Sequence, residues 1–268
     1  RERALLGEEL RTELDLLWMT GELKLEKPPV AQEVAWALHF FDTTLFNVVW
    51  LLHDSLALAL SESYPGEHFD LPSFIQFGSW VGGDRDGNPN VTNEVTRAAV
   101  REYRAKCLHR YQRRVAELSR ALSISERSAS FTPAFRKALE QALHASGDGE
   151  RLAARNPGEL CRQWLSVVQR RLAATVDESQ RKRGGQGLTS PPYATADDLI
   201  ADLKTLEKAL VDAECAAIGR ATVVPVRREV EAFRFSTVRL DLRQGSGAYN
   251  AAVAELRDRV IRVAVEKF

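Results

Sequence analysis

The sequence predicts a mainly α fold, and two observations carry that prediction. Apolar residues recur at three- and four-residue spacing over most of the 268 residues, which is the period of helices that bury one face. Only two short segments, residues 74–80 and 238–243, have the character of β-strands. Hydrophobic residues make up 44% and charged residues 28%, so a chain of this length can bury a sizeable core.

The first quarter of the chain predicts two helices. Residues 1–19 carry one apolar stripe, formed by Leu6, Leu10, Leu14 and Leu17. Pro28 and Pro29 interrupt this pattern, and we expect a second helix from Val30 to about Ser61, with a length of roughly 45–50 Å. No uninterrupted apolar run approaches the roughly 18–20 residues of a membrane span, so we expect no membrane contact.

Further helices follow in the rest of the chain. We expect them after residue 92, over 133–145 and 159–176, after residue 195, and over 249–267. Thr92 is suited to an N-cap, and Thr195 forms a candidate capping box with Asp198. Gly219 can end the helix that Thr195 begins. Residues 177–194 contain glycines, prolines and three consecutive basic residues, which indicates a mobile surface loop.

Charge and cysteine content exclude several classes of protein. The 37 Lys and Arg residues balance the 37 Asp and Glu residues, and this zero net charge argues against a nucleic-acid-binding protein. Three widely spaced cysteines without a CxxC pair favour the reducing cytoplasm over a disulfide framework or a zinc site. The five histidines also occur singly, so we expect no metal site within this chain.

The segment 238–243 alternates between apolar and charged side chains. Its charged face carries Arg239, Asp241 and Arg243. On an exposed hairpin such a face would simply contact water, but a strand in a mainly helical protein is usually covered on both faces, where charges must pair or meet a ligand. Asp241 can neutralise one arginine, which leaves Arg243 at the C-terminal end of the strand, where parallel barrels bind substrate groups. Its planar guanidinium suits a phosphate or a carboxylate.

A loop rich in glycine and polar residues follows the first strand candidate. It contains Gly82, Gly83, Asp84, Arg85, Asp86, Gly87 and Asn88. Glycines allow unusual backbone angles there, and Asp and Asn side chains can bond their own backbone. One alternative is a calcium loop of the EF-hand kind, but Pro89 stands where that loop needs Gly and Val95 where it needs Glu. A phosphate-binding P-loop is excluded, because no Gly-Lys-Ser/Thr follows.

Three segments together resemble the phosphoenolpyruvate carboxylase family. Residues 77–92, FGSWVGGDRDGNPNVT, resemble the family motif S-W-M-G-G-D-R-D-G-N-P-x-V-T, with Val81 in place of Met. Residues 238–244, VRLDLRQ, resemble V-R-[IL]-D-[IL]-R-Q. Residues 18–24, WMTGELK, are similar to a drifted W-x-T-D-E-I-R. The order and rough spacing of the three segments agree with the family.

The resemblance implies that residues 1–268 are a single partial domain of a larger carboxylase. The helices would surround part of a parallel β/α barrel, of the TIM kind, to which residues 74–80 and 238–243 contribute two parallel strands. The catalytic histidine, the catalytic lysine and the ligands of a Mg or Mn ion would lie outside this chain. We therefore expect the isolated chain to be inactive, and its unpaired strand edges to favour association.

The implied reaction forms oxaloacetate and phosphate from phosphoenolpyruvate and bicarbonate, an anaplerotic carbon fixation in the cytoplasm. By resemblance, Arg243 is a catalytic residue that holds the phosphate or carboxyphosphate, and Trp80 lies in an apolar wall around carbon dioxide. Residues 82–88 would be the loop scaffold, and Arg239 and Asp241 a supporting ion pair. The partners would be the rest of the carboxylase chain and further copies, because family members are generally tetramers.

An alternative from a different class of protein stays open. The chain would then be a non-catalytic helical module that keeps the loop and the strand as packing elements. In that case Trp80 would be a core anchor.

Overall fold

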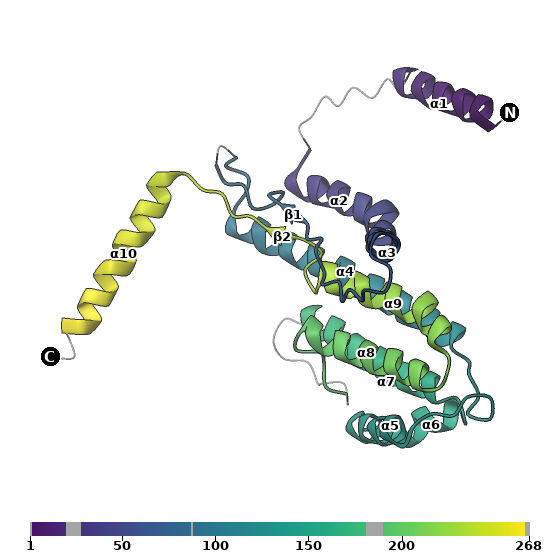
Figure 1. Ribbon diagram of the computed structural model, residues 1–268. Helices are drawn as coiled ribbons and strands as arrows, with labels where there is room; N and C mark the ends of the chain where they lie inside the picture. The colour runs from purple at the N-terminus through teal and green to yellow at the C-terminus, as the bar shows by residue number, and fades with distance from the viewer. Residues whose placement is uncertain (1, 20–27, 87, 181–189, 266–268) are drawn as a thin grey trace.

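The computed structural model describes residues 2–19, 28–86, 88–180 and 190–265 (Figure 1). Within these ranges the chain is mainly helical, which confirms the predicted class. The helices are α1 (Glu2–Met19), α2 (Val30–Phe40), α3 (Phe46–Ser63), α4 (Asn93–Ala121), α5 (Pro133–Ala145), α6 (Gly149–Arg155), α7 (Leu160–Gln180), α8 (Ala196–Asp212), α9 (Ala216–Phe233) and α10 (Ser246–Val265). Figure 1 shows α1 and α10 standing apart from the body that the other helices form.

The expected long helix after Pro29 is bent. Between α2 and α3 lies one π-helical segment, η1 (Phe41–Leu45). Figure 1 shows α2 from the side and α3 nearly end-on, so the axis changes direction at η1. A π segment is a recognised cause of such a kink, and the apolar periodicity that predicted one straight helix does not reveal it.

The continuous helical stretch Val30–Ser63 is long and apolar enough to cross a membrane, judged by length and composition only. This differs from the expectation based on uninterrupted apolar runs, because an average over a window tolerates single polar residues. Within this chain, 17% of its most apolar window is buried. One such helix is a weak indication, since a helix in the core of a soluble protein passes the same test.

The centre of the body is α4, which packs against α7 and α9, while α8 packs against α9. The apolar face of α4 is buried, with Tyr103, Tyr111 and Val115 all at most 2% exposed. Both predicted helix starts are confirmed: the Thr92 side chain accepts the amide of Val95, and Thr195 forms a capping box with Asp198. The apolar period and the caps therefore predicted these helices correctly.

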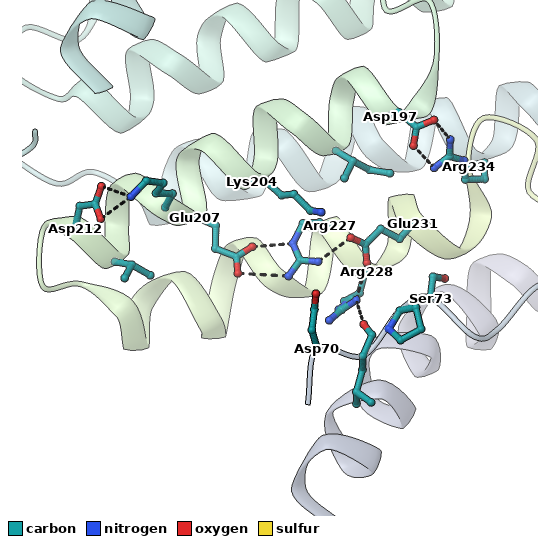
Figure 2. A pocket seen from close by; sticks show the side chains of 15 residues that line it. Asp70, Ser73, Asp197, Lys204, Glu207, Asp212, Arg227, Arg228, Glu231 and Arg234 are labelled. Carbon is teal, nitrogen blue, oxygen red and sulfur yellow. Dashed lines mark hydrogen bonds and ion pairs between the residues drawn. The ribbon is translucent and has the colours of Figure 1, made fainter. Parts of the chain in front are cut away.

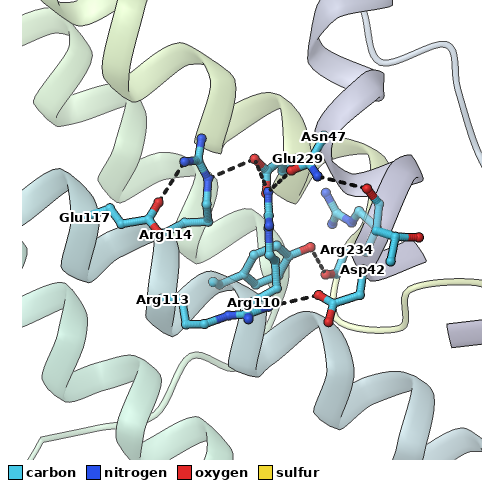
Figure 3. A network of polar contacts seen from close by, with 10 residues as sticks. Asp42, Asn47, Arg110, Arg113, Arg114, Glu117, Glu229 and Arg234 are labelled. Atoms are coloured by element: carbon cyan, nitrogen blue, oxygen red, sulfur yellow. Dashed lines mark hydrogen bonds and ion pairs between the residues drawn. The ribbon is translucent and has the colours of Figure 1, made fainter. Parts of the chain in front are cut away.

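A buried carboxylate joins three of these helices (Figure 3). The side chain of Glu229, on α9, is 0% exposed and accepts hydrogen bonds from Arg110 and Arg114 of α4 at 2.9–3.3 Å. Arg110 also donates to Asn47 Oδ1 of α3 at 2.8 Å. A carboxylate without solvent is costly unless it is paired in this way, so the network ties α3, α4 and α9 into one arrangement.

The helix that Thr195 begins ends earlier than expected. It stops at Asp212, and Gly219 lies inside α9, which was not predicted as a separate helix. The turn between them passes through Glu214 with φ of 60°, a left-handed conformation that usually marks glycine. A Cβ at Gly219 would lie 3.5 Å from Leu210 Cβ, an ordinary van der Waals distance, so Gly219 faces α8 from within α9 and does not end a helix.

The loop expected over 177–194 is shorter at both ends, because α7 continues to Gln180 and the chain packs into the core again by Ser190. Ser190 is 2% exposed and Tyr193 is 1% exposed. The Tyr193 hydroxyl donates to Asp202 at 2.6 Å. Residues 181–189, including the basic run, lie outside the described residues.

Two short strands lie on the edge of the helical body. β1 (Gly78–Ser79) pairs with β2 (Arg239–Leu240) in parallel, with Gly78 opposite Arg239. The predicted parallel pairing of these two segments is confirmed, although each strand is much shorter than expected. In the described part of the chain, this pair is the sheet that the structure shows, and a barrel is not seen.

Aromatic packing holds the start of β1 against the helices. The Phe77 ring, directly before β1, stacks on Phe233 at the end of α9 with centroids 5.2 Å apart and an angle of 7°. Phe41 of η1 contacts both rings edge-on. The bent helix and α9 thereby fix where β1 begins.

Candidate functional site

The two sequence motifs form a single structural unit. Hydrogen bonds run from the Arg239 amide to the Phe77 carbonyl and from the Asp241 amide to the Ser79 carbonyl, both at 2.8 Å. The pairing resumes beyond the strands, where the Arg243 amide donates to Gly83 at 3.0 Å and the Arg85 amide donates to Arg243 at 2.9 Å. The glycine-rich loop therefore lies beside the C-terminal end of β2.

The two glycines of the loop are required by close packing on opposite sides. Gly82 has φ of 85°, and a Cβ there would lie 2.5 Å from Ala99 Cβ of α4. A Cβ on Gly83 would lie 2.4 Å from the Asp241 carbonyl oxygen. Neither contact is possible for a real side chain, so the loop can sit between α4 and β2 only with glycine at both positions.

The polar side chains of the loop shape its backbone. Asp84 Oδ1 accepts the amide of Asp86 at 3.2 Å, and Asn88 Oδ1 accepts the amide of Asn90 at 3.1 Å. Both contacts are turns of the kind that Asp and Asn favour. Arg85 points to α4, where its Nη2 donates to Thr96 Oγ1 at 3.1 Å. Asp86 is exposed, and Gly87 lies outside the described residues.

Arg243 pairs with Asp84 rather than with Asp241. Its Nη1 lies 3.3 Å from Asp84 Oδ2, and the two residues stand opposite each other in an isolated parallel bridge. In the described part of the chain, the side chains of Arg239 and Asp241 make no ion pair, and both residues are exposed. Among the described residues, no element covers this charged face, which differs from the expectation that both faces of the strand are covered.

Trp80 does not anchor the core of this chain. Its side chain is 60% exposed, although it follows β1 directly. The Trp80 carbonyl accepts the amides of Gly83 and Asp84 at 2.9 and 3.0 Å, so its backbone closes the turn that begins the loop. Trp80 and Arg243, whose side chain is 57% exposed, both remain open to a ligand.

One residue near this unit was missed as a site residue. Tyr103 lies on the apolar face of α4, and its hydroxyl donates to the Val81 carbonyl at 3.1 Å and lies 3.3 Å from Ser79 Oγ. A tyrosine on the apolar face of a helix gives no sequence signal for such contacts, because they join positions more than 20 residues apart.

The described residues offer few groups for other kinds of chemistry. They bring together no group of three or more His, Cys, Asp or Glu side chains that could hold a metal ion. Asp84, the first ligand of the calcium alternative, uses its oxygens for Arg243 and for its own turn. Burial raises the pKa of Cys107 to about 11 and of Cys161 to about 12, so neither thiol is a nucleophile near neutral pH.

A cavity of about 620 Å³ lies away from the strands, between α8, α9 and residues 70–73 (Figure 2). Its charged walls are largely paired with one another. Arg227 contacts Glu207 and Glu231 at 2.7 Å, and Arg228 donates to the Leu71 carbonyl at 3.0 Å. These charges neutralise one another across the cavity, so it is a weaker candidate than the strand ends.

Comparison with known proteins identifies the family. A model of phosphoenolpyruvate carboxylase matches residues 1–266. The phosphoenolpyruvate carboxylase of Methylorubrum extorquens is 52% identical over 246 residues, which cover 92% of this chain and 26% of that protein. The enzyme of the same name from Roseiflexus castenholzii is 35% identical, with 92% and 27% covered, and that from Bradyrhizobium diazoefficiens is 34% identical, with 96% and 27% covered.

The chain thus spans about a quarter of the length of the curated relatives that it matches. Both motifs that the structure joins at the ends of β1 and β2 lie inside the matched residues. The chain belongs to the phosphoenolpyruvate carboxylase family.

Proposed function

We propose that the longer protein represented by this chain forms oxaloacetate and phosphate from phosphoenolpyruvate and bicarbonate, and that the ends of β1 and β2 are part of its active site. The observation that supports this most is the position of Arg243. Its backbone is held by two hydrogen bonds to the glycine-rich loop, whereas its guanidinium is largely exposed at the C-terminal end of β2. Substrate groups bind at this end of the strands in parallel barrels.

Arg243 would hold the phosphate of phosphoenolpyruvate or of carboxyphosphate. Phosphoryl transfer depends mainly on positioning and on stabilising charge at the oxygens, which an arginine does well. Among the described residues, the Arg243 side chain has one contact, from Nη1 to Asp84. Its other donors can therefore face an oxyanion, while Asp84 keeps the guanidinium oriented.

Trp80 would form part of the apolar wall around carbon dioxide and the pyruvate enolate. These species must be kept from water until they combine. Its exposure in this chain supports a contact with ligand or with other parts of the protein over a role in the helical core.

The finer architecture extends the same proposal. β1 and β2 would be two neighbouring strands of a parallel β/α barrel that the rest of the carboxylase completes, in a cytoplasmic homo-oligomer. The implied Mg or Mn ion does not fit the residues described here, which provide no cluster of metal donors, so its ligands would belong to the rest of the protein. In anaplerotic carbon fixation, this chain would contribute the oxyanion contact and the apolar wall.

Replacement of Arg243 tests the proposal. In the full-length protein, Arg243→Ala should lower the rate of oxaloacetate formation at least about 100-fold, the effect of removing one donor from a developing oxyanion. Arg97→Ala is the matched control, because Arg97 is an exposed arginine at the start of α4, just after the loop, and pairs with Glu94 at 3.6 Å. Equal rates for the wild type and Arg243→Ala would reject the assignment and favour the non-catalytic helical module.

A further inference from the structure

Tyr103 of α4 contacts the chain on both sides of Trp80, the residue that follows β1. It is 2% exposed, and its hydroxyl donates to the Val81 carbonyl at 3.1 Å. The Ser79 hydroxyl lies 3.3 Å from the Tyr103 hydroxyl, and it accepts the Val81 amide at 3.2 Å. The residues on both sides of Trp80 are therefore tied to a single buried hydroxyl.

The backbone of Tyr103 holds the other strand. Its carbonyl accepts the hydroxyl of Thr237 at 2.6 Å. Thr237 is 2% exposed and has φ of 60°, which is rare for a β-branched residue and persists only where the surroundings enforce it. Two residues later the chain enters β2, which ends near Arg243.

Tyr103 thus makes hydrogen bonds to the segments that carry both strands of the site. We propose that Tyr103 is a positioning residue that sets Trp80 relative to Arg243 and thereby keeps carbon dioxide within reach of the enolate; this rests on the proposed carboxylase function. The hydroxyl itself touches no reacting atom. It holds the Ser79–Val81 backbone, and that backbone carries Trp80.

The Tyr103 hydroxyl is suited to donate this hydrogen bond. Burial raises the pKa of Tyr103 above its ordinary value, so the hydroxyl keeps its proton near neutral pH. At that pH the Val81 carbonyl is provided with a donor. Without that donor, the Val81 carbonyl loses its hydrogen bond in a partly buried place, and the segment has a reason to move.

The consequence of a displaced Trp80 is a change in products. Carbon dioxide that escapes before the enolate attacks it leaves the enolate to take a proton from solvent and become pyruvate. In the full-length enzyme, Tyr103→Phe removes only the hydroxyl and should raise the ratio of pyruvate to oxaloacetate severalfold. Trp80→Ala is the positive control and should raise the same ratio.

Tyr111→Phe is the matched negative control. Tyr111 lies on the same helix, is 0% exposed, and donates its hydroxyl to the Arg234 carbonyl at 2.6 Å, away from Trp80. Its loss should destabilise the fold to a similar degree but leave the product ratio unchanged. Because the ratio is measured per turnover, a smaller folded fraction does not alter it. A wild-type ratio in Tyr103→Phe, or equal increases in both tyrosine variants, would overturn the proposal.

A second measurement separates this proposal from the proposed function. The amides of Gly83 and Asp84 both donate to the Trp80 carbonyl, so their hydrogen exchange reports the turn directly. In the full-length protein, exchange at these amides should be faster in Tyr103→Phe and unchanged in Tyr111→Phe. If the protein makes no oxaloacetate, the proposed function fails, and this exchange result still decides whether Tyr103 sets the turn. Unchanged exchange in Tyr103→Phe would overturn it.

Discussion

The helical body, formed by α2 to α9, and the strand edge, formed by β1, β2 and the loop, differ in how far their side chains are buried. In the body, large side chains from α4, α7 and α8 are fully buried, as Tyr111, Leu172 and Leu203 show, and the carboxylate of Glu229 is enclosed by two arginines. At the edge, Trp80 and Arg243 are more than half exposed, although their backbones are tightly hydrogen-bonded. The body therefore buries its large side chains within this chain. The edge instead combines a hydrogen-bonded backbone with exposed side chains, as a surface that binds a ligand or another part of the protein does.

The terminal helices resemble the edge rather than the body. Leu10 and Leu17 of α1 are 62% and 72% exposed, and Val253 and Leu256 of α10 are similarly open. Since the curated relatives are about four times longer than this chain, we expect other parts of the protein to cover these apolar faces.

The largest effect is expected inside the body. Glu229→Ala leaves Arg110 and Arg114 without their buried partner and should lower the free energy of unfolding of this chain by about 3–5 kcal/mol. Glu255→Ala is the control on α10, where the exposed pair with Arg259 should contribute about 0.5 kcal/mol or less. Urea unfolding followed by circular dichroism measures both values, and equal losses would contradict the division into body and periphery.

A smaller effect is expected at the edge. Gly83→Ala places a methyl group 2.4 Å from the Asp241 carbonyl and should cost about 1–3 kcal/mol, as overpacking does, while separating the loop from β2. Gly78→Ala is the matched control, since its nearest neighbour would be the Arg239 carbonyl at 3.9 Å. The same unfolding experiment compares them. If Gly83→Ala and Gly78→Ala have equal free energies of unfolding, the close contact of the loop with β2 does not contribute to stability.

The sequence predicted what depends on local pattern. The apolar period and its caps placed α4, α5 and α8 at their correct starts, and β-character with alternation found both strands. The parallel pairing of these strands followed from the resemblance. Local pattern could not show the turn at Glu214, because a non-glycine residue adopts the left-handed conformation there.

The details of the site depend on contacts between distant positions. Arg243 pairs with Asp84, which is 159 residues earlier, so the alternation within the strand, which left Arg243 without a partner, could not show this pair. Tyr103 reads as an ordinary core residue until the fold brings its hydroxyl to Val81. The sequence therefore predicted which segments meet, and the structure was needed to find which side chains orient them.

The most direct test of the account compares hydrogen exchange in this chain alone and in the full-length protein. The amides of Arg239, Asp241 and Arg243 donate to the carbonyls of Phe77, Ser79 and Gly83, so their exchange reports on the edge. We predict that they exchange more slowly in the full-length protein, because other parts of the carboxylase cover this edge, while amides within α4 and α8 are equally protected in both. Equal exchange at the edge in the two forms would show that this chain completes the site alone and would contradict the account.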